Sequence, residues 1–455
     1  METVLLYALG VLILLVGLML SIGLHEVGHL VPAKKFGVKV GQYMIGFGPT
    51  LWSKRFGETE YGVKAIPLGG YISMAGMFPP AKPGGRARTA STGFFDTVMQ
   101  EADAPARRGS TMIAEAREAS LDGLEDGHHR AFYKLATWKR IIIMLGGPAM
   151  NLLLAILFFG IVYSGFGVPQ VSTTVGSVSA CVLPITSERQ ECLDTDPAAP
   201  GAAAGLLPGD EIVEVDGVAV ADWTEATEII RAHPDQTISF VVLRDSAETE
   251  LSVTPILTER YTFDDAGEVV LDASGDPVLE PVGFVGISPA YERVTEPVTA
   301  VIPAVWDRAV AVGEVIITLP GRLYELAVST FSGTERDPNG PVGIVGVGRI
   351  AGEIASLDTI PVVDRAAGMI ELLGGLNLAL FLFNLIPLMP LDGGHVAGAI
   401  VESIRRGFAK LFGRPDPGPV DTAKLIPVTL TITTVLALMS VFLIFAHIVN
   451  PVSIL

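Results

Sequence analysis

An uncharged stretch that runs directly into a metal-binding motif constrains this chain more than any other feature. Residues 3–24 contain no charged side chain, and the sequence HEVGH follows at once, from His25 to His29. As a helix, this stretch is long enough to cross a bilayer core, which is about 30 Å thick. Ionisable side chains within an apolar span are costly and usually mark a functional site. The motif therefore predicts a site at membrane depth.

The spacing of HEVGH suits a single metal ion. On a helix, His25 and His29 lie one turn apart on the same face, so both imidazole rings can reach one ion. Glu26 projects from a neighbouring face, close enough to take a proton from a metal-bound water. The motif also occurs by chance on soluble surface helices, but the apolar surroundings argue against that alternative. We therefore predict a metal site with Glu26 as its general base.

Four stretches of the chain are apolar enough to cross a membrane. Hydrophobic residues make up 49% of the chain, charged residues make up 18%, and the mean hydropathy is +0.49. These values are typical of a membrane protein with soluble parts. Besides the first stretch, we predict spans at about residues 141–166, 369–390 and 426–449. The first stretch is too long for a cleaved signal peptide and has no basic residue before it, so we expect it to be retained.

The placement of lysine and arginine predicts the orientation in the membrane. Residues 34–140 hold sixteen basic and ten acidic side chains, and residues 171–297 hold five basic and twenty-four acidic ones. Residues 396–425 hold five basic and three acidic ones. Because basic connections stay on the cytoplasmic side, we expect the first and third connections to be cytoplasmic and the second to be extracytoplasmic. Both termini are then extracytoplasmic. The net charge of −18 makes nucleic-acid binding unfavourable.

The only two cysteines, Cys181 and Cys192, fall in the extracytoplasmic segment. Disulfides form in oxidising compartments, so the orientation predicts a bond between them. Two unlinked thiols are the alternative.

The first half of the chain combines two spans with a small sheet and an insertion. We expect residues 1–78 to form the first transmembrane helix and a membrane-associated β-hairpin sheet, because residues 37–76 are glycine-rich with short β-prone pieces. Residues 79–131 are expected to be a flexible cytoplasmic insertion, with His128 and His129 in a solvated loop rather than in a second metal site. The second transmembrane helix is assigned to residues 132–169. In this helix Asn151 is a polar side chain at membrane depth. It could serve helix packing or have a role near the active site, and the sequence leaves both roles open.

The extracytoplasmic region, residues 170–292, contains a compact αβ pattern. Between about residues 201 and 257 we predict strands at 211–215, 238–244 and 250–255, with a helix at 224–232. The pattern resembles a PDZ domain, in which a glycine-containing loop and a strand accept an extended peptide. The resemblance assigns this loop to Gly205, Leu206 and Leu207. An unrelated small β fold is the alternative.

The remaining segments follow in order. We expect residues 293–352 to form amphipathic helices on the outer membrane surface. Residues 353–395 are expected to contain the third transmembrane helix. Residues 396–425 are expected to be a cytoplasmic loop, and residues 426–455 contain the fourth transmembrane helix. The predicted fold class is a multi-span α-helical membrane protein with about four transmembrane helices, a membrane-associated β-hairpin sheet and an inserted PDZ-like αβ domain.

A second polar motif lies at the end of the third span. The sequence NLIPLMPLDGGH, from Asn384 to His395, places a carboxylate beside helix-breaking prolines and glycines. Catalytic zinc requires a third protein ligand besides the two histidines, and Asp392 is the best candidate. His395 is the rival ligand, and Glu371 is a weaker one because no motif surrounds it.

Several motifs in a fixed order resemble the site-2 protease family, in particular its bacterial RseP-type intramembrane zinc metalloproteases. They are HEVGH, GGYISMAG at 69–76, GGPAMN at 146–151, the PDZ-like domain and NLIPLMPLDGGH. The resemblance implies a zinc ion held by His25, His29 and Asp392, with Glu26 as general acid and base. It further implies substrate contacts at Asn384 and at a membrane-embedded β-loop that includes Gly69, Gly70 and Tyr71. The chain departs from the family pattern in having one clear PDZ-like unit and a long insertion after residue 78.

The resemblance implies an intramembrane zinc endopeptidase in the bacterial inner or plasma membrane. Its expected substrates are single-span regulatory membrane proteins, such as anti-sigma factors, that have already been shortened outside. Two alternatives remain. A catalytically inactive scaffold would not need the intact HEVGH and Asp392, and a zinc transporter would more often show internal repeats.

Overall fold

The computed structural model describes residues 1–78, 88–91, 130–183, 191–193, 195–262, 269–272, 277–334, 340–420 and 425–450. The chain forms two compact units. Met1–Phe166 and Pro297–Leu455 make up the first, called the membrane unit here, and Gly167–Glu296 make up the second, called the outer unit. Most of the predicted insertion at 79–131, including its two histidines, lies outside the described residues, which cover only 88–91 and 130–131 of it.

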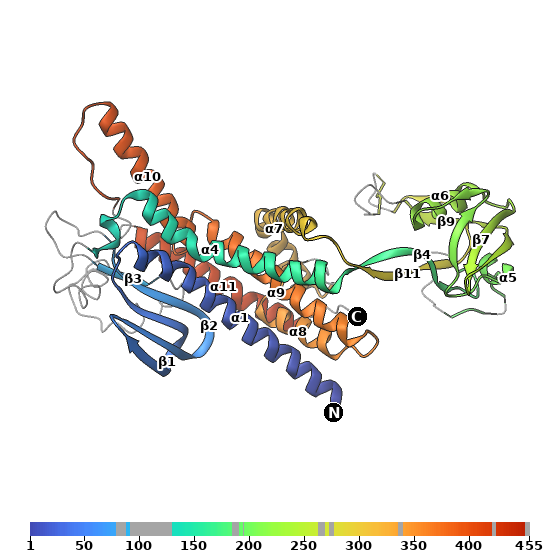
Figure 1. The fold of residues 1–455 in the computed structure, drawn as a ribbon, viewed down its shortest axis with the longest axis horizontal. Coiled ribbons are helices and arrows are strands. Elements are labelled where there is room, and N and C mark those ends of the chain that lie inside the picture. The colour runs from blue at the N-terminus through green and yellow to red at the C-terminus, as the bar shows by residue number, and fades with distance from the viewer. Residues whose placement is uncertain are drawn as a thin grey trace. The chain divides into compact units, whose positions relative to one another are not determined.

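Four helices of the membrane unit are long and apolar enough to cross a bilayer within the described ranges. They are α1 (Glu2–Lys35), α4 (Thr137–Gly160) with its π-helical extension η3 (Ile161–Phe166), α9 (Val362–Leu385) and α11 (Ile426–Val449). The predicted count of four is confirmed. Because α1 has 34 residues, it is about 50 Å long and carries HEVGH in its second half (Figure 1).

The other helices of the membrane unit differ in part from the sequence-based expectation. The expected amphipathic segment forms one continuous helix, α7 (Val298–Ser332), despite two internal prolines, and a shorter helix, α8 (Ile344–Ser356). The first half of the expected cytoplasmic loop at 396–425 is helical, because α10 (Asp392–Leu411) extends into it. A short 3-10 helix, η2 (Phe132–Lys134), precedes α4. The chain leaves helical geometry at Leu385, so Asp392 opens a new helix instead of ending the third span.

A small antiparallel sheet lies beside α1, as the glycine-rich sequence predicts. It consists of β1 (Val40–Phe56), β2 (Thr59–Phe78) and β3 (Arg88–Ser91) in that order. Residues 42–45 of β1 pair with residues 60–63 on one side and 70–73 on the other, because the long strands bend back on themselves. The Tyr43 hydroxyl donates a hydrogen bond of 2.8 Å to the Gly23 carbonyl. This bond fastens the sheet to the turn of α1 that precedes HEVGH.

The outer unit is a β-rich fold with two short helices. Its main sheet has the order β11-β4-β5-β7-β8, with β6 beside β5, and a second sheet pairs β9 with β10. The strands are β4 (Val168–Val178), β5 (Glu211–Val215), β6 (Val218–Ala219), β7 (Ile238–Arg244), β8 (Ala247–Val253), β9 (Ile256–Tyr261), β10 (Leu279–Phe284) and β11 (Ile287–Val294). The helices are α5 (Pro200–Ala204) and α6 (Trp223–Ala232).

Most predicted elements of the outer unit are confirmed. The strands at 211–215 and 238–244 have the expected bounds, and the helix begins one residue early, at Trp223. The strand expected at 250–255 instead runs from Ala247 to Val253. The carboxylate of Asp222 caps α6 by accepting a hydrogen bond from the Glu225 amide. The unit also includes β4 and β11, which the αβ pattern did not contain.

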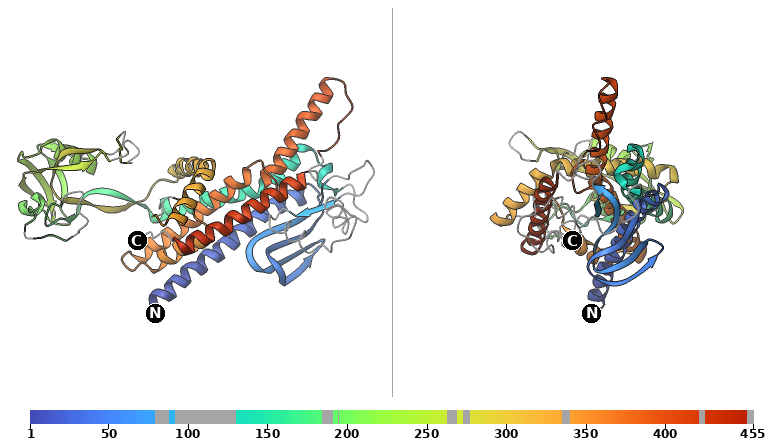
Figure 2. Two further views of the ribbon diagram at one scale, coloured as in Figure 1. Left: turned by 180° about the vertical axis from the view of Figure 1, so that it is seen from behind. Right: turned by 90° about the vertical axis from the view of Figure 1, so that its left-hand side faces the viewer.

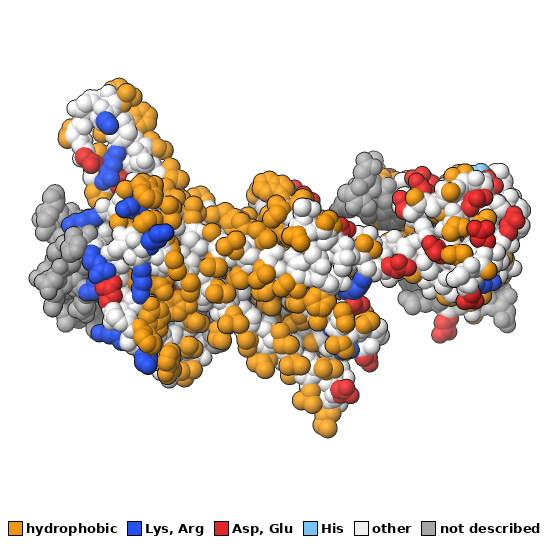
Figure 3. Space-filling model, viewed as in Figure 1, with side chains coloured by type: hydrophobic (Ala, Val, Ile, Leu, Met, Phe, Trp, Pro, Cys, Tyr) orange, Lys and Arg blue, Asp and Glu red, His pale blue; other side chains and the backbone are white. Residues whose placement is uncertain are grey.

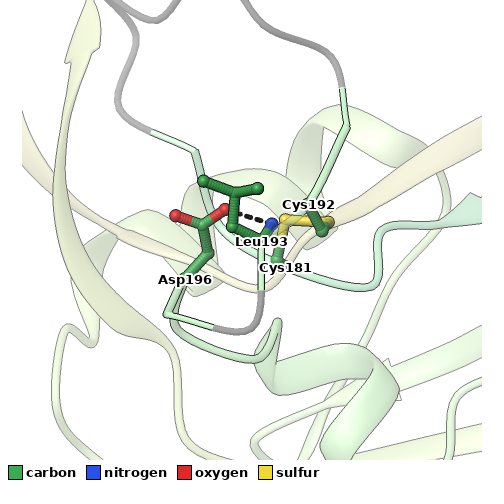
Figure 4. Close-up of a disulfide and its surroundings, with 4 residues drawn as sticks. All are labelled: Cys181, Cys192, Leu193 and Asp196. Carbon is green, nitrogen blue, oxygen red and sulfur yellow. Dashed lines mark hydrogen bonds between the residues drawn. A yellow bond between two sulfur atoms is a disulfide. The ribbon is translucent and has the colours of Figure 1, made fainter.

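Two covalent or ionic links stabilise the outer unit. Cys181 and Cys192 form the expected disulfide, and next to it the Leu193 amide donates to Asp196 (Figure 4). Elsewhere the guanidinium of Arg244 donates two hydrogen bonds of 2.7 Å to the buried carboxylate of Asp210. Arg244 lowers the pKa of Asp210 below its usual value through these hydrogen bonds.

The surface chemistry differs between the two units. Hydrophobic side chains cover most of the visible face of the membrane unit, whereas acidic side chains are spread over the outer unit (Figure 3). On the membrane unit, lysine and arginine gather at the end that carries the sheet and α10 (Figure 3). Seen from behind, the sheet and α10 again lie at the same end of the helical bundle (Figure 2).

Candidate metal centre

Three side chains from two helices converge at one point of the membrane unit. His25 and His29 come from α1, and Asp392 is the first residue of α10. The two Nε2 atoms lie 3.2 Å apart, and each lies 3.3 Å from the Asp392 Oδ2. Within the described part of the chain, this is the one group of three such residues whose ligand atoms could share an ion. The candidate ligands that the sequence predicts are therefore brought together.

The triangle has the dimensions of a zinc site. A tetrahedral zinc ion bound at 2.0–2.1 Å holds its ligand atoms about 3.3–3.4 Å apart. The side chains of His29 and Asp392 are 0% and 5% exposed, and that of His25 is 12% exposed. No hydrogen-bond donor among the described residues reaches the Asp392 Oδ2. Two ring nitrogens and an anionic oxygen at these distances fit a bound cation.

The orientation of His29 is fixed by the main chain of α4. Its Nδ1 lies 2.7 Å from the Ile143 carbonyl oxygen, to which the ring N–H donates. In a neutral imidazole the other nitrogen, Nε2, then carries the free lone pair. The ring therefore presents the correct nitrogen to the ion.

Three glycines let α4 lie directly against α1 at the site. A Cβ on Gly28 would lie 2.2 Å from the Gly146 carbonyl oxygen, and a Cβ on Gly146 would lie 2.1 Å from the Gly28 carbonyl. A Cβ on Gly147 would lie 2.2 Å from the His29 Nε2 and 2.7 Å from the His25 Nε2. The small residues of GGPAMN thus allow the close helix contact that the sequence predicts.

A tight loop between α9 and α10 positions Asp392. A Cβ on Gly393 would lie 2.4 Å from the Ile386 carbonyl oxygen, and one on Gly394 would lie 2.6 Å from the Met389 nitrogen. The loop can therefore fold back only because two glycines follow the aspartate. This explains the spacing of the LDGG motif.

Glu26 is buried next to the small sheet. The residue is only 3% exposed to solvent. A Cβ on Gly70 would lie 3.0 Å from the Glu26 Cγ. Gly69, Gly70 and Tyr71 therefore bring the sheet up to the catalytic turn of α1. Asn384 lies in the last turn of α9 and is half-buried.

The rival ligands lie in other environments. His395 lines a small cavity together with Arg140 and Glu402, and it is not part of the three-residue cluster. Glu371 forms an ion pair of 2.5 Å with Arg308 of α7. These placements favour Asp392 as the third ligand.

A buried ion pair that the sequence reasoning did not identify holds α10 against α4. The Arg140 guanidinium donates to both carboxylate oxygens of Glu402, at 2.5 and 3.1 Å, and the two side chains are 8% and 1% exposed. The Val420 amide and Arg406 also contact this carboxylate. The sequence offers only a weak signal for the pair, because its members are separated by most of the chain.

The outer unit contains a cavity of about 270 Å³ between α6 and the second sheet. Its lining includes Trp223, Ile230, Arg260, Phe284 and Ile287. The predicted peptide loop lies elsewhere. Leu206 is 2% exposed and belongs to the core, and Gly205 ends α5 in a left-handed conformation, so neither these two residues nor Leu207 line the cavity.

Comparisons with known proteins agree with this site. The sequence model of peptidase family M50 matches residues 13–413 of the chain. The chain is 30% identical over 451 residues to the zinc metalloprotease Rip1 of Mycobacterium tuberculosis, covering 98% of both chains. It is 33% identical over 465 residues to Rip1 of Mycolicibacterium smegmatis, covering 98% of this chain and 99% of that one. It is 25% identical over 422 residues to the zinc metalloprotease RasP of Bacillus licheniformis, covering 84% and 87%.

The match spans most of the chain, includes both halves of the metal centre, and extends to relatives that are named zinc metalloproteases. The chain therefore belongs to peptidase family M50 and is a membrane-bound zinc metalloendopeptidase of the site-2 protease type.

Proposed function

We propose that this protein cleaves transmembrane segments of single-span regulatory proteins, such as anti-sigma factors, after those proteins have been shortened outside. The observation that carries the proposal is the triangle of ligand atoms, with sides of 3.2–3.3 Å, formed by helices of a membrane-spanning bundle. A peptidase site enclosed by membrane-spanning helices can act only on segments that enter the bilayer.

In the proposed mechanism, His25, His29 and Asp392 hold the zinc ion. Bound zinc acts as a Lewis acid that polarises a peptide carbonyl and makes water more acidic. The Glu26 carboxylate takes a proton from the attacking water and returns it to the leaving amine. The burial of Glu26 at 3% exposure keeps bulk water away from this proton transfer.

The small sheet is the proposed holder of the substrate backbone. The carbonyls of a transmembrane helix are hydrogen-bonded within the helix, so the scissile segment must unwind before attack. An extended segment can be stabilised by adding to a strand. Gly69–Tyr71 precede the part of β2 that pairs with β3, and Gly70 abuts Glu26. We place the unwound segment alongside these residues, with Asn384 as a further contact by resemblance to the family.

The outer unit is the proposed gate for substrate size. Its acidic surface and disulfide suit the extracytoplasmic side, and the lysine- and arginine-rich end of the membrane unit suits the cytoplasm (Figure 3). Within a PDZ-like interpretation of this unit, residues 205–207 remain the proposed peptide loop, with Leu206 packed in the core and Leu207 50% exposed, and the cavity beside α6 is a further candidate for peptide binding.

The test compares purified wild-type protein with Glu26→Gln, both in detergent and matched for zinc content. The substrate is a single-span protein with a short outer stub. General acid–base catalysis contributes about 100- to 10,000-fold in rate, so Glu26→Gln is expected to bind zinc, fold normally and leave the substrate uncut. Equal cleavage by both proteins would remove Glu26 from the mechanism.

The ligand assignment is tested separately by zinc content. Asp392→Ala is expected to lose zinc, whereas His395→Ala is the matched control and is expected to keep it. The reverse result would show that the rival histidine is the ligand.

A further inference from the structure

Two of the buried polar groups that have no hydrogen-bond partner among the described residues lie on α1 and α4, the helices that meet at the metal centre. One is the Nδ1 of His25, and the other is the side-chain amide of Asn151, where both Oδ1 and Nδ2 are unpartnered. Asn151 is 1% exposed. A buried polar group without a partner costs about 1–3 kcal/mol, so native proteins rarely leave one unsatisfied. Both groups therefore require a partner in the working protein.

Asn151 lies one helical turn from the residue of α4 that contacts the His25 ring. Gly147 touches the His25 ring, since a Cβ there would lie 2.7 Å from both its Cε1 and its Nε2. Asn151 follows four residues later on the same face of α4, about 6 Å further along the helix axis. The Nδ1 atom is bonded to the same Cε1 that faces Gly147.

The direction of the two helices supports this placement. Helix α4 runs antiparallel to α1. Gly28 meets Gly146, and about three turns away on each helix Gly17 and Phe158 both reach the same turn of α9. Moving from Gly147 to Asn151 therefore corresponds to moving from His29 back past His25 on α1. Asn151 lies beside the part of α1 that carries the unpartnered nitrogen.

We propose that Asn151 is a positioning residue for the zinc ligand His25. Its Oδ1 accepts, through one ordered water, the proton of the His25 Nδ1–H, and so holds Nε2 toward the ion. The inference rests on the proposed function, because it takes His25 as a ligand. Each histidine ligand would then have a hydrogen-bond acceptor for its Nδ1–H, since the Nδ1–H of His29 donates to the Ile143 carbonyl at 2.7 Å. Outer partners of this kind are typically worth about 10- to 100-fold in metal affinity.

Asn377 provides a matched control on α9. It is 0% exposed, and its Nδ2 donates to the Ser21 hydroxyl at 2.9 Å and to the Leu373 carbonyl at 2.8 Å. It is therefore a buried asparagine of the same bundle whose amide nitrogen connects α9 to Ser21 of α1, while its Oδ1 has no hydrogen-bond partner among the described residues. Replacing it should lower stability without changing the zinc ligands.

The experiment measures zinc affinity by chelator competition on the full-length protein in detergent, together with the visible spectrum of the cobalt-substituted form. Asn151→Leu removes both polar atoms at similar volume and is expected to weaken zinc binding about 10- to 100-fold and to alter the cobalt spectrum. Asn377→Leu is expected to keep wild-type zinc affinity and spectrum while melting at a lower temperature. Asn151→Asp keeps the acceptor and the size, and it is expected to bind zinc at least as tightly as wild type.

The outcomes separate this inference from the proposed function. Wild-type affinity in Asn151→Leu, or equal weakening in Asn377→Leu, would overturn the positioning role. If Asn151→Leu does not fold, weaker zinc binding by Asn151→Asp overturns it instead. Wild-type zinc affinity in His25→Ala would overturn the ligand assignment itself, whereas zinc loss in His25→Ala with wild-type affinity in Asn151→Leu would overturn only the inference.

Discussion

Replacing Gly147 with alanine places a methyl group at the position where the two histidines meet α4. The new Cβ would lie 2.2 Å from the His29 Nε2 and 2.7 Å from the His25 Nε2. Ordinary van der Waals contact begins near 3.4 Å. The His29 ring would therefore have to move by about 1.2 Å, or α4 would have to move away from α1, where Gly146 is in equally close contact with Gly28.

The size of the effect follows from the tolerance of metal ligation. Zinc–ligand distances are held within about 0.2 Å, so a displacement of about 1.2 Å removes at least one nitrogen ligand. Loss of a ligand exceeds the effect of losing an outer partner, which is about 10- to 100-fold. We expect Gly147→Ala to weaken zinc binding by more than about 100-fold, or about 2.7 kcal/mol, and to abolish cleavage.

Zinc affinity and peptide cleavage are measured on the purified protein, and Gly160→Ala is the matched control. A Cβ on Gly160, at the end of the same helix, would meet no atom within 4 Å. This control should bind zinc normally and gain about 0.5–1 kcal/mol of helix stability. Wild-type zinc affinity in Gly147→Ala would refute the close approach of α4 to the ligands.

Three further predictions concern other parts of the molecule. Arg140→Met leaves the buried Glu402 carboxylate without its main partner, so the protein should lose about 3–5 kcal/mol of stability. The loss is measured as a lower thermal midpoint of unfolding in detergent. An unchanged midpoint would show that the ion pair contributes nothing to stability. Because the pKa of Asp210 is lowered in the folded state through its hydrogen bonds with Arg244, its contribution is present above the unfolded pKa of about 3.9 and is lost as the pH falls through the folded value. Hydrogen-exchange protection of the outer unit should therefore fall on acidification in the wild type and less steeply in Asp210→Asn. A cysteine at Ser246 should react with an impermeant maleimide added outside cells, since the two native cysteines are bonded to each other, and labelling only after lysis would reverse the predicted orientation.

The ligand set could be predicted from sequence because metal chemistry leaves few choices. HEVGH supplies two nitrogens at helical spacing. Asp392 lies in an apolar segment, where burying a carboxylate is costly unless it is paired or bound to a metal. The start of a new helix at Asp392 was not predicted. Two prolines and two glycines within nine residues indicate a break, but they do not show whether the chain continues as a loop or as a helix. Residues 396–425 are expected to be a loop because they connect two predicted spans, whereas the apolar residues of α10 recur at helical spacing.

The supporting contacts of the site could not be predicted, because they depend on how helices pack. Nothing in the sequence connects Arg140 with Glu402, or Gly147 with the histidine rings. The sequence leaves helix packing and a role near the active site both open for Asn151, and its burial on α4, one turn from Gly147, is the observation behind the proposed positioning role. In the outer unit, local strand and turn patterns located β5 and β7, whereas β4 and β11 pair across most of the unit and carry no local signal.

The split of the site between α1 and α10 also sets the order in which it is completed during synthesis. The histidines are made near the start of the chain, and their third partner is residue 392 of 455. At about 5–20 residues per second, roughly 20–70 s separate the two on the ribosome. Throughout that interval the first helix can be in the membrane with its motif intact, yet the cluster lacks its carboxylate. A nascent chain therefore cannot cut neighbouring membrane proteins until its third span and α10 have emerged and packed against the first two.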